Sequence, residues 1–151
     1  MGLVIRTEER SLFSVTTDYK LAHCISSDFA LGAGIALEFD KRFDMRAKLN
    51  NSYPGYMYDY INNNINGDCL QIGSVYNLVT KQMYYNKPSY TSFKNSINSL
   101  KHQMERNKDT KLAIPKLGCG LDKLSWNKVF DIIVSEFEDY KYDLEIIVCV
   151  I

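Results

Sequence analysis

Apolar side chains recur at helical spacing in three segments of this chain. In each segment they stand three or four positions apart, so they lie along one face of an amphipathic helix. Ser125 stands just before the third segment, in the place of an N-terminal cap. The three apolar faces are Ile35, Ala36 and Phe39, on a segment running to about Arg42; Phe93, Ile97, Leu100 and Met104; and Val129, Ile133 and Phe137.

Short continuous apolar runs lie before, between and after these helical segments. Runs of this length predict buried strands, and the β-branched run at the end of the chain is typical of a sheet covered on both faces. Two of the runs flank Gly73-Ser74 and therefore predict a strand pair. The predicted strands are residues 3–5, 21–25, 69–72, 75–80, 112–114 and 144–151.

The alternation of strands and helices predicts an α/β fold with crossover connections and a mostly parallel sheet. The length favours a single domain over residues 1–151. Residues 50–66 interrupt the alternation: they are rich in Asn and Tyr and contain Pro54-Gly55, so we expect a surface excursion with short pieces of regular structure. Its tyrosines predict a partly buried surface hairpin rather than a lip of a binding cleft; they are Tyr53, Tyr56, Tyr58 and Tyr60.

Charge and composition exclude several classes of function. The formal net charge is zero, so the chain lacks the electrostatic footprint of a general nucleic-acid-binding protein. It has neither a signal-peptide core nor an apolar run long enough to span a bilayer. Two histidines and four scattered cysteines lack the spacing of a zinc site, so no metal is expected. We expect a monomer with free thiols in a reducing compartment, the cytoplasm or the nucleus.

Two glycine-containing loops, each after a predicted strand, carry the candidate chemistry. One is Pro-Lys-Leu-Gly-Cys-Gly-Leu-Asp at 115–122, and the other is Gly32-Ala33-Gly34. Glycines let backbone N–H groups approach an anion with no Cβ in the way, and Asp122 adds a general acid or base. Ligands of α/β folds bind beyond the carboxyl ends of strands, so these loops and Thr80-Lys81 form one crevice if their strands are neighbours. Such a crevice suits a ligand with two phosphates and a reactive end.

Each of these features also has a plain structural interpretation. The glycines would form tight turns, Asp122 would cap the following helix, and Lys81 would be a solvated charge at a strand end. His23 lies in an apolar strand and is interpreted as a core side chain rather than a ligand. Cys119 would be a nucleophile if a base such as His23 were near, although the chain has no local cysteine-hydrolase signature.

Five short motifs follow one another in a characteristic order. They are Leu-Ala-His-Cys-Ile-Ser at 21–26, Gly-Ala-Gly-Ile-Ala at 32–36, Leu-Val-Thr-Lys at 78–81, Lys-Pro-Ser-Tyr at 87–90, and the loop 115–122 followed by Leu124 and Trp126. In order and spacing they resemble the macrodomain family, and most closely its branch of terminal ADP-ribose protein glycohydrolases. The resemblance implies a three-layer α/β/α macrodomain with a mixed, mostly parallel central sheet and an ADP-ribose cleft.

The same resemblance assigns roles to residues of this chain. It implies that Lys81 and Asp122 are the catalytic pair, with no cofactor. Gly32 to Ala36 would line the distal-ribose side, Ser26 and Thr80 would lie beside the ribose, and the 118–121 backbone would donate to the diphosphate. The implied ADP-ribose-binding residues are Ser11, Leu12, Ser26, Gly32, Gly34, Ile35, Ala36, Thr80, Gly118, Cys119, Gly120 and Leu121.

The resemblance also implies an activity: removal of terminal mono-ADP-ribose from glutamate or aspartate esters of proteins, and deacylation of O-acyl-ADP-ribose. An amine such as Lys81 suits this chemistry because it forms a Schiff base with the opened ribose, while Asp122 moves the proton. The expected partners are ADP-ribose and mono-ADP-ribosylated proteins, not membranes or specific nucleic-acid sequences. The alternative function is a reader module that binds ADP-ribose without turnover.

One position departs from the family pattern. Ser11 stands where the family has an aspartate that accepts a hydrogen bond from the adenine amino group. Such a charge-assisted bond contributes about 1.5–3 kcal/mol, so a neutral serine predicts weaker selectivity for adenine.

If the chain is viral, opposing ADP-ribosylation in a host cell would be a natural purpose.

Overall fold

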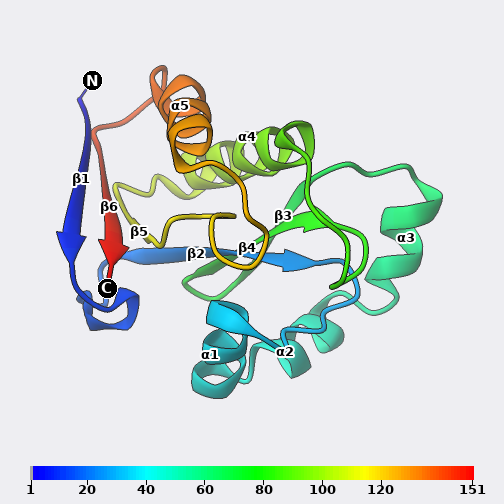
Figure 1. Ribbon diagram of the computed structural model, residues 1–151. Coiled ribbons are helices and arrows are strands. Elements are labelled where there is room, and N and C mark those ends of the chain that lie inside the picture. Colours follow the sequence, from blue (N-terminus) through cyan, green and yellow to red (C-terminus); the bar gives the residue numbers. More distant parts are fainter. Residues whose placement is uncertain (1) are drawn as a thin grey trace.

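The computed structural model describes residues 2–151, which form a six-stranded sheet between two layers of helices (Figure 1). The strand order is β1-β6-β5-β2-β4-β3, and all neighbours are parallel except the hairpin β3–β4. The predicted α/β/α fold with a mixed, mostly parallel sheet is confirmed. The elements are β1 Leu3–Glu9, η1 Leu12–Ser14, β2 Lys20–Ser26, α1 Gly34–Phe43, α2 Met45–Ser52, α3 Tyr56–Asn62, β3 Asp68–Ile72, β4 Val75–Lys81, α4 Tyr90–Asn107, β5 Lys111–Ile114, α5 Trp126–Phe137 and β6 Leu144–Val150.

Two apolar cores lie on opposite faces of this sheet. Helices α4 and α5 cover one face, whereas α1, α2 and α3 cover the other (Figure 1). Successive side chains of a strand point to opposite faces, and β4 follows this rule: Tyr76 and Leu78 belong to the first core, Val75 and Val79 to the second. The helical stripes predicted on α4 and α5 are buried in the first core.

The prediction of a surface hairpin at residues 50–66 is wrong. This part of the chain holds the end of α2 and all of α3, because Tyr56 and Tyr60 face the core four residues apart, one helical turn. The phenol of Tyr60 accepts from the Gly67 N–H, and that of Tyr56 donates to Asp68 Oδ2. Buried tyrosines with bonded hydroxyls therefore fix this segment to the start of β3.

The predicted cap at Ser125 is only half right. Ser125 occupies the N-cap position of α5, but its side chain makes no capping hydrogen bond. The phenol of Tyr90 instead accepts from the Ser125 backbone N–H. Helix α4 has the complete arrangement, in which Ser89 and Ser92 cap each other's backbone.

Gly67 is the glycine that we expect to tolerate substitution least. Its φ is +103°, and an added Cβ would lie 2.2 Å from the Ser92 carbonyl oxygen. Gly67→Ala is therefore expected to lower the free energy of unfolding by more than about 3 kcal/mol, measured by urea denaturation. The matched control is Gly55→Ala, at φ +71° in open space, which is expected to cost only about 1–2 kcal/mol. Equal losses in the two variants would contradict this assignment.

His23 is a buried core side chain. Its ring stacks on Phe39, its Nε2 lies 2.6 Å from Asn77 Oδ1, and its Nδ1 has no hydrogen-bond partner among residues 2–151. The Asn77 amide nitrogen donates to the Leu70 carbonyl, so Asn77 Oδ1 is left to accept from His23. Burial lowers the pKa of His23 from 6.5 to about 4, and the folded protein therefore holds it neutral.

The His23 pKa predicts how stability depends on pH. Between pH 6.5 and 4 the unfolded chain binds a proton at His23 that the folded chain does not. The free energy of unfolding therefore decreases as the pH is lowered from 6.5 to 4. The expected loss is about 3 kcal/mol. Chemical denaturation at a series of pH values measures it, and the His23→Leu variant should have a flatter profile. An unchanged slope in this variant would show that His23 is not the cause.

Candidate active site

The three polar strand ends predicted to meet do meet, because β2 lies between β4 and β5 in the sheet. Ser26, at the end of β2, pairs with Lys81, at the end of β4, after an irregularity that leaves Thr80 out of the ladder. The loop after β5 carries residues 115–122 to the same edge. Parallel strands place their carboxyl ends together, so the two glycine loops and Lys81 surround one space.

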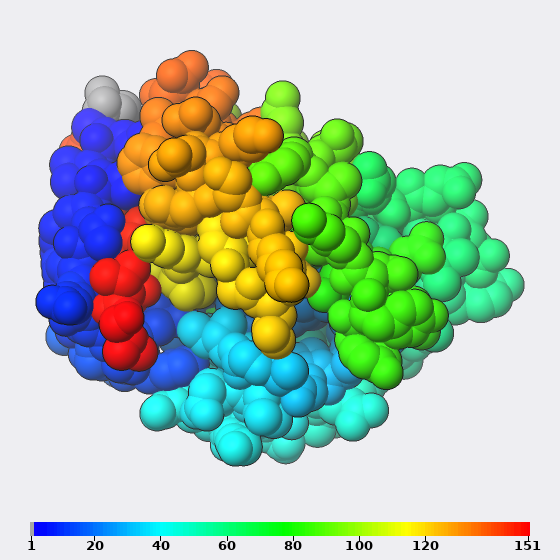
Figure 2. Space-filling view, viewed as in Figure 1, coloured from blue at the N-terminus to red at the C-terminus, as the bar shows by residue number. Residues whose placement is uncertain are grey.

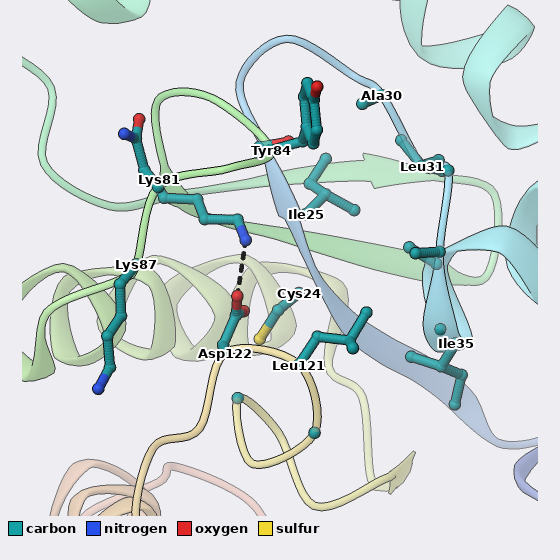
Figure 3. Close-up of a pocket in the computed structure, with 18 of the residues that line it drawn as sticks. Cys24, Ile25, Ala30, Leu31, Ile35, Lys81, Tyr84, Lys87, Leu121 and Asp122 are labelled. Atoms are coloured by element: carbon teal, nitrogen blue, oxygen red, sulfur yellow. Dashed lines mark hydrogen bonds and ion pairs between the residues drawn. The ribbon is translucent and has the colours of Figure 1, made fainter.

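That space is an open cavity of about 960 Å³. Its size lies in the upper part of the range for small-molecule sites in proteins. Figure 3 shows the cavity between the loop after β2, the loop after β4 and the loop after β5. Figure 2 shows the last of these loops next to the residues around α1 at the surface, and both segments line the cavity.

Lys81 and Asp122 face each other within this cavity. Lys81 Nζ donates a hydrogen bond to Asp122 Oδ1 across 2.6 Å (Figure 3). Their side chains are 13% and 16% exposed, so the ion pair is mostly shielded but remains open to the cavity. A proton can pass directly between an amine and a carboxylate at this distance. The arrangement therefore offers a primary amine with its own proton acceptor.

Most of the residues predicted for the ligand line this cavity. Beside Lys81 and Asp122, the lining residues from that set are Ser26, Gly32, Gly34, Ile35, Ala36, Gly118, Gly120 and Leu121. Four other predicted residues do not line it: Ser11 and Leu12 lie at η1, the buried Thr80 borders a second hollow, and Cys119 turns its thiol to the Leu117 carbonyl.

The two glycine loops touch at Gly34 and Leu121. Gly34 has φ +58°, and a Cβ there would lie 3.3 Å from Leu121 Cδ1. Leu121 is 71% exposed and lines the cavity, so its side chain reaches toward the opposite loop. A larger residue at position 34 would press on Leu121 and narrow the cavity. The left-handed φ therefore favours glycine at this position, whereas the exposed Leu121 side chain could move to make room for a Cβ.

Asp28 ties the loop after β2 to the loop after β4. Its Oδ1 accepts from the Ser26 hydroxyl at 2.5 Å and from the Ala30 N–H at 3.2 Å. Its Oδ2 accepts from the Tyr84 N–H at 3.0 Å. The Asp28 carboxylate therefore joins the two loops that form two walls of the cavity. It also orients the Ser26 hydroxyl, which lines the cavity.

The cysteine-nucleophile alternative receives no support from the geometry. Burial raises the pKa of the Cys119 thiol, which disfavours the nucleophilic thiolate. Burial also raises the pKa of Cys24, which lies beside Asp122 in the cavity wall (Figure 3). His23, the base considered for Cys119, is fully buried and bonded to Asn77.

Several lining residues were not predicted from the sequence. Cys24, Tyr84, Tyr85 and Lys123 all line the cavity, and Asp28 braces it. Their position in the sequence could have indicated the tyrosines, because residues 82–87 follow the carboxyl end of a parallel strand, where ligands bind. Their residue types alone gave no indication, because exposed tyrosines and lysines occur on any surface.

Residues 2–151 contain neither a cluster of metal ligands nor a helix able to span a membrane. No group of three or more His, Cys, Asp or Glu side chains there is arranged to hold a metal ion. Among the helices of the same residues, none has the length and hydropathy needed to cross a membrane.

Comparisons with known proteins place this geometry in context. The chain is 34% identical over 131 residues to human ADP-ribose glycohydrolase OARD1, covering 84% of this chain and 80% of that protein. It is 40% identical over 74 residues, 49% of this chain and 72% of the relative, to uncharacterized protein 032R of Invertebrate iridescent virus 6. The macrodomain of Mycobacterium tuberculosis DarG superposes with a TM-score of 0.76 over 99% of both chains, at 19% identity. No family model matches the sequence.

Proposed function

Since this chain belongs to the macrodomain family, in its branch of terminal ADP-ribose glycohydrolases, we propose that it is an ADP-ribose-binding hydrolase that cleaves ADP-ribosyl esters of protein glutamate or aspartate. The observation that carries this proposal is the Lys81–Asp122 pair, 2.6 Å apart inside a cavity of nucleotide size. Similarity to human ADP-ribose glycohydrolase OARD1 supports the general reaction. The ester substrate and the roles of the two residues are part of the proposal, and they follow from the family resemblance together with the chemistry of an amine beside a carboxylate.

The first step is attack by Lys81 on C1″ of the distal ribose. Asp122 accepts a proton from the Lys81 ammonium, and the neutral amine then forms a bond to C1″. The bond from C1″ to the ester oxygen breaks, and the protein carboxylate leaves with its electron pair. Transfer of a proton from nitrogen to the ring oxygen opens the sugar and gives a Schiff base. Asp122 is suited to the proton transfer because its Oδ1 already contacts Lys81 Nζ.

The second step returns the enzyme to its starting state. Water adds to C1″ of the Schiff base, the C–N bond breaks, and Asp122 supplies the proton that the departing amine takes up. The net reaction consumes one ester and one water and yields the carboxylate, a proton and ADP-ribose. The same steps apply to ADP-ribose that carries the acyl group on the C1″ oxygen, in which case a free carboxylate leaves in place of the protein carboxylate.

The glycine loops hold the ligand for this reaction. In our proposal the backbone N–H groups of Gly118, Gly120 and Leu121 bind the diphosphate, whereas the Cys119 N–H already donates to the Lys116 carbonyl. Gly32 to Ala36 border the distal ribose. Lys116 and Lys123 also line the cavity and contribute positive charge beside a bound diphosphate. Fixing the diphosphate keeps C1″ within reach of Lys81, and such positioning accounts for much of the rate enhancement of many enzymes.

The test is incubation with a protein mono-ADP-ribosylated on glutamate, followed by measurement of free ADP-ribose. The hydrolase proposal predicts release by the wild-type protein. The second candidate function, a reader module, predicts tight binding of ADP-ribose in calorimetry with no release. The close Lys81–Asp122 pair favours the hydrolase, because a module that only binds has no need for an amine beside a proton acceptor.

Ser11→Asp is expected to tighten ADP-ribose binding about tenfold if position 11 contacts adenine as in the family pattern, since a carboxylate accepts a stronger bond than a hydroxyl. Ser11 now caps η1 by accepting from the Phe13 N–H. Aspartate is an equally good capping residue, so the substitution should preserve the local fold. Calorimetry with ADP-ribose measures the change, and Ser14→Asp is the control at a nearby exposed position. An unchanged affinity would place adenine elsewhere.

A further inference from the structure

The loop between β4 and α4 presents two adjacent aromatic side chains at the mouth of the cavity. Tyr84 and Tyr85 are 64% and 70% exposed, and their rings meet edge to face with centroids 5.3 Å apart. Both line the main cavity. In the view of Figure 3, Tyr84 and Asp122 lie on either side of the Lys81 ammonium. The aromatic pair therefore borders the same cavity as the Lys81–Asp122 pair.

The backbone of this loop is fixed. The Tyr84 N–H donates to Asp28 Oδ2, as described above. Met83 and Asn86 bond each other twice: the Met83 N–H donates to Asn86 Oδ1 at 2.9 Å, and the Asn86 N–H donates to the Met83 carbonyl at 3.0 Å. Two exposed tyrosines on a braced loop are a preorganised surface, which loses little entropy when a partner binds.

A second, polar hollow of about 360 Å³ shares part of its lining with the main cavity. Lys81, Asn86 and Lys87 line both spaces. The hollow is also bordered by Asn66 and by Thr80, whose buried Oγ1 has no hydrogen-bond partner among residues 2–151. Buried hydroxyls are almost always bonded, so an unpaired one behind the wall of this hollow is unusual.

We propose that Tyr84, Tyr85, Asn86 and Lys87 form a subsite for the polypeptide that carries the ADP-ribose, one that prefers a second carboxylate near the modified residue. The inference rests on the proposed function, because it assigns the sugar nucleotide to the main cavity. The acceptor chain then leaves the cavity beside Lys81 and crosses the loop. The tyrosines pack on its side chains, the amides and hydroxyls of the hollow bond its backbone, and the Lys87 ammonium attracts the flanking carboxylate.

Charge favours a polypeptide over a nucleic acid as the occupant. A single-stranded nucleic acid also stacks on tyrosines, but it needs several cations along its phosphates. Within the proposed subsite Lys87 is the single cationic residue. A peptide needs fewer charges and more hydrogen-bonding partners, and the amide and hydroxyl side chains of the hollow provide them.

Binding tests the subsite separately from catalysis. In a Lys81→Ala background, which leaves substrate intact, calorimetry compares free ADP-ribose with an acidic peptide ADP-ribosylated on glutamate. We expect the peptide to bind about tenfold more tightly, and adding Tyr84→Ala and Tyr85→Ala should bring the ratio of the two affinities close to one. Adding Tyr58→Ala instead, at a 72% exposed tyrosine on α3, is the matched control and should retain the gain.

Turnover provides the second readout. The ratio of kcat/KM for the peptide to kcat/KM for O-acetyl-ADP-ribose should fall about tenfold in Tyr84→Ala/Tyr85→Ala, and about threefold in Lys87→Ala. Equal binding of peptide and free ADP-ribose, or an equal fall for both substrates, would overturn the subsite. So would a gain seen only with an ADP-ribosylated oligonucleotide. Absence of release by the wild-type protein would refute the hydrolase proposal alone, because the binding comparison would still decide the subsite.

Discussion

Lys81→Ala is expected to abolish the release of ADP-ribose from a glutamate-modified protein, with a loss of at least about 10³-fold in kcat. The variant lacks the amine that forms the covalent bond to C1″, and no other amine contacts Asp122 in the side-chain hydrogen bonds of residues 2–151. The affinity for ADP-ribose should change little, because the backbone of the glycine loops provides most of the proposed contacts. Single-turnover release assays and calorimetry measure the two effects.

Lys81→Arg is the control that keeps the charge. A guanidinium can pair with Asp122, but it stays protonated and cannot act as the nucleophile, so this variant should be as inactive as Lys81→Ala. If either variant retained a rate within tenfold of the wild type, Lys81 would not form the covalent intermediate. In that case the ion pair would merely position the ligand.

Asp122→Ala is expected to lower turnover by about 10²–10⁴-fold, the usual contribution of a positioned acid–base group. Asp122 accepts the hydrogen bond from Lys81 Nζ and is the carboxylate next to the proposed reaction centre. Some substrate should still react with Lys81 in this variant. Loss of the Asp122 carboxylate should then slow hydrolysis of the covalent intermediate more than it slows formation of that intermediate. A covalent adduct on Lys81 should then accumulate, and intact-protein mass spectrometry followed by peptide mapping detects it.

Two controls sharpen the test of Asp122. Asp122→Asn keeps the size and one oxygen but cannot take up a proton, so it should resemble Asp122→Ala in rate. Asp131→Asn removes a carboxylate from α5, outside the cavity lining, and should be as active as the wild type. Full activity of Asp122→Ala would refute its role as the acid–base group.

The regular parts of the fold were predictable because they repeat a local pattern. The stripe of Phe93, Ile97, Leu100 and Met104 specifies the buried face of α4, and each of these residues is at most 1% exposed. The two helices between Met45 and Asn62 were missed for different reasons: α2 has few apolar residues, and α3 is a short segment in a region whose Asn, Tyr and Pro54-Gly55 are typical of a loop. Asp44 ends α1 in a left-handed conformation and α2 starts directly after it, a break that no glycine or proline announces.

The candidate site was predictable only in part. Glycine loops and the polar ends of strands have sequence signatures. Together with the family resemblance, they predict Lys81, Asp122 and most of the other residues that line the cavity. Tyr84, Tyr85 and Asp28 have no such signature. They matter because the Asp28 carboxylate joins residues 56 positions apart, and local sequence does not specify a contact at that separation.

Periodicity and glycine placement are local properties of the chain, so the strands, the helices α1, α4 and α5, and the residue types that could perform the chemistry were all evident before the fold was known. The tertiary structure decided which of these residues meet. The strand order places β2 between β4 and β5, and only that order brings an amine at position 81 within 2.6 Å of a carboxylate 41 positions later. Chain crossovers, not local propensities, set that distance, because the carboxyl ends of neighbouring parallel strands must share one edge of the sheet.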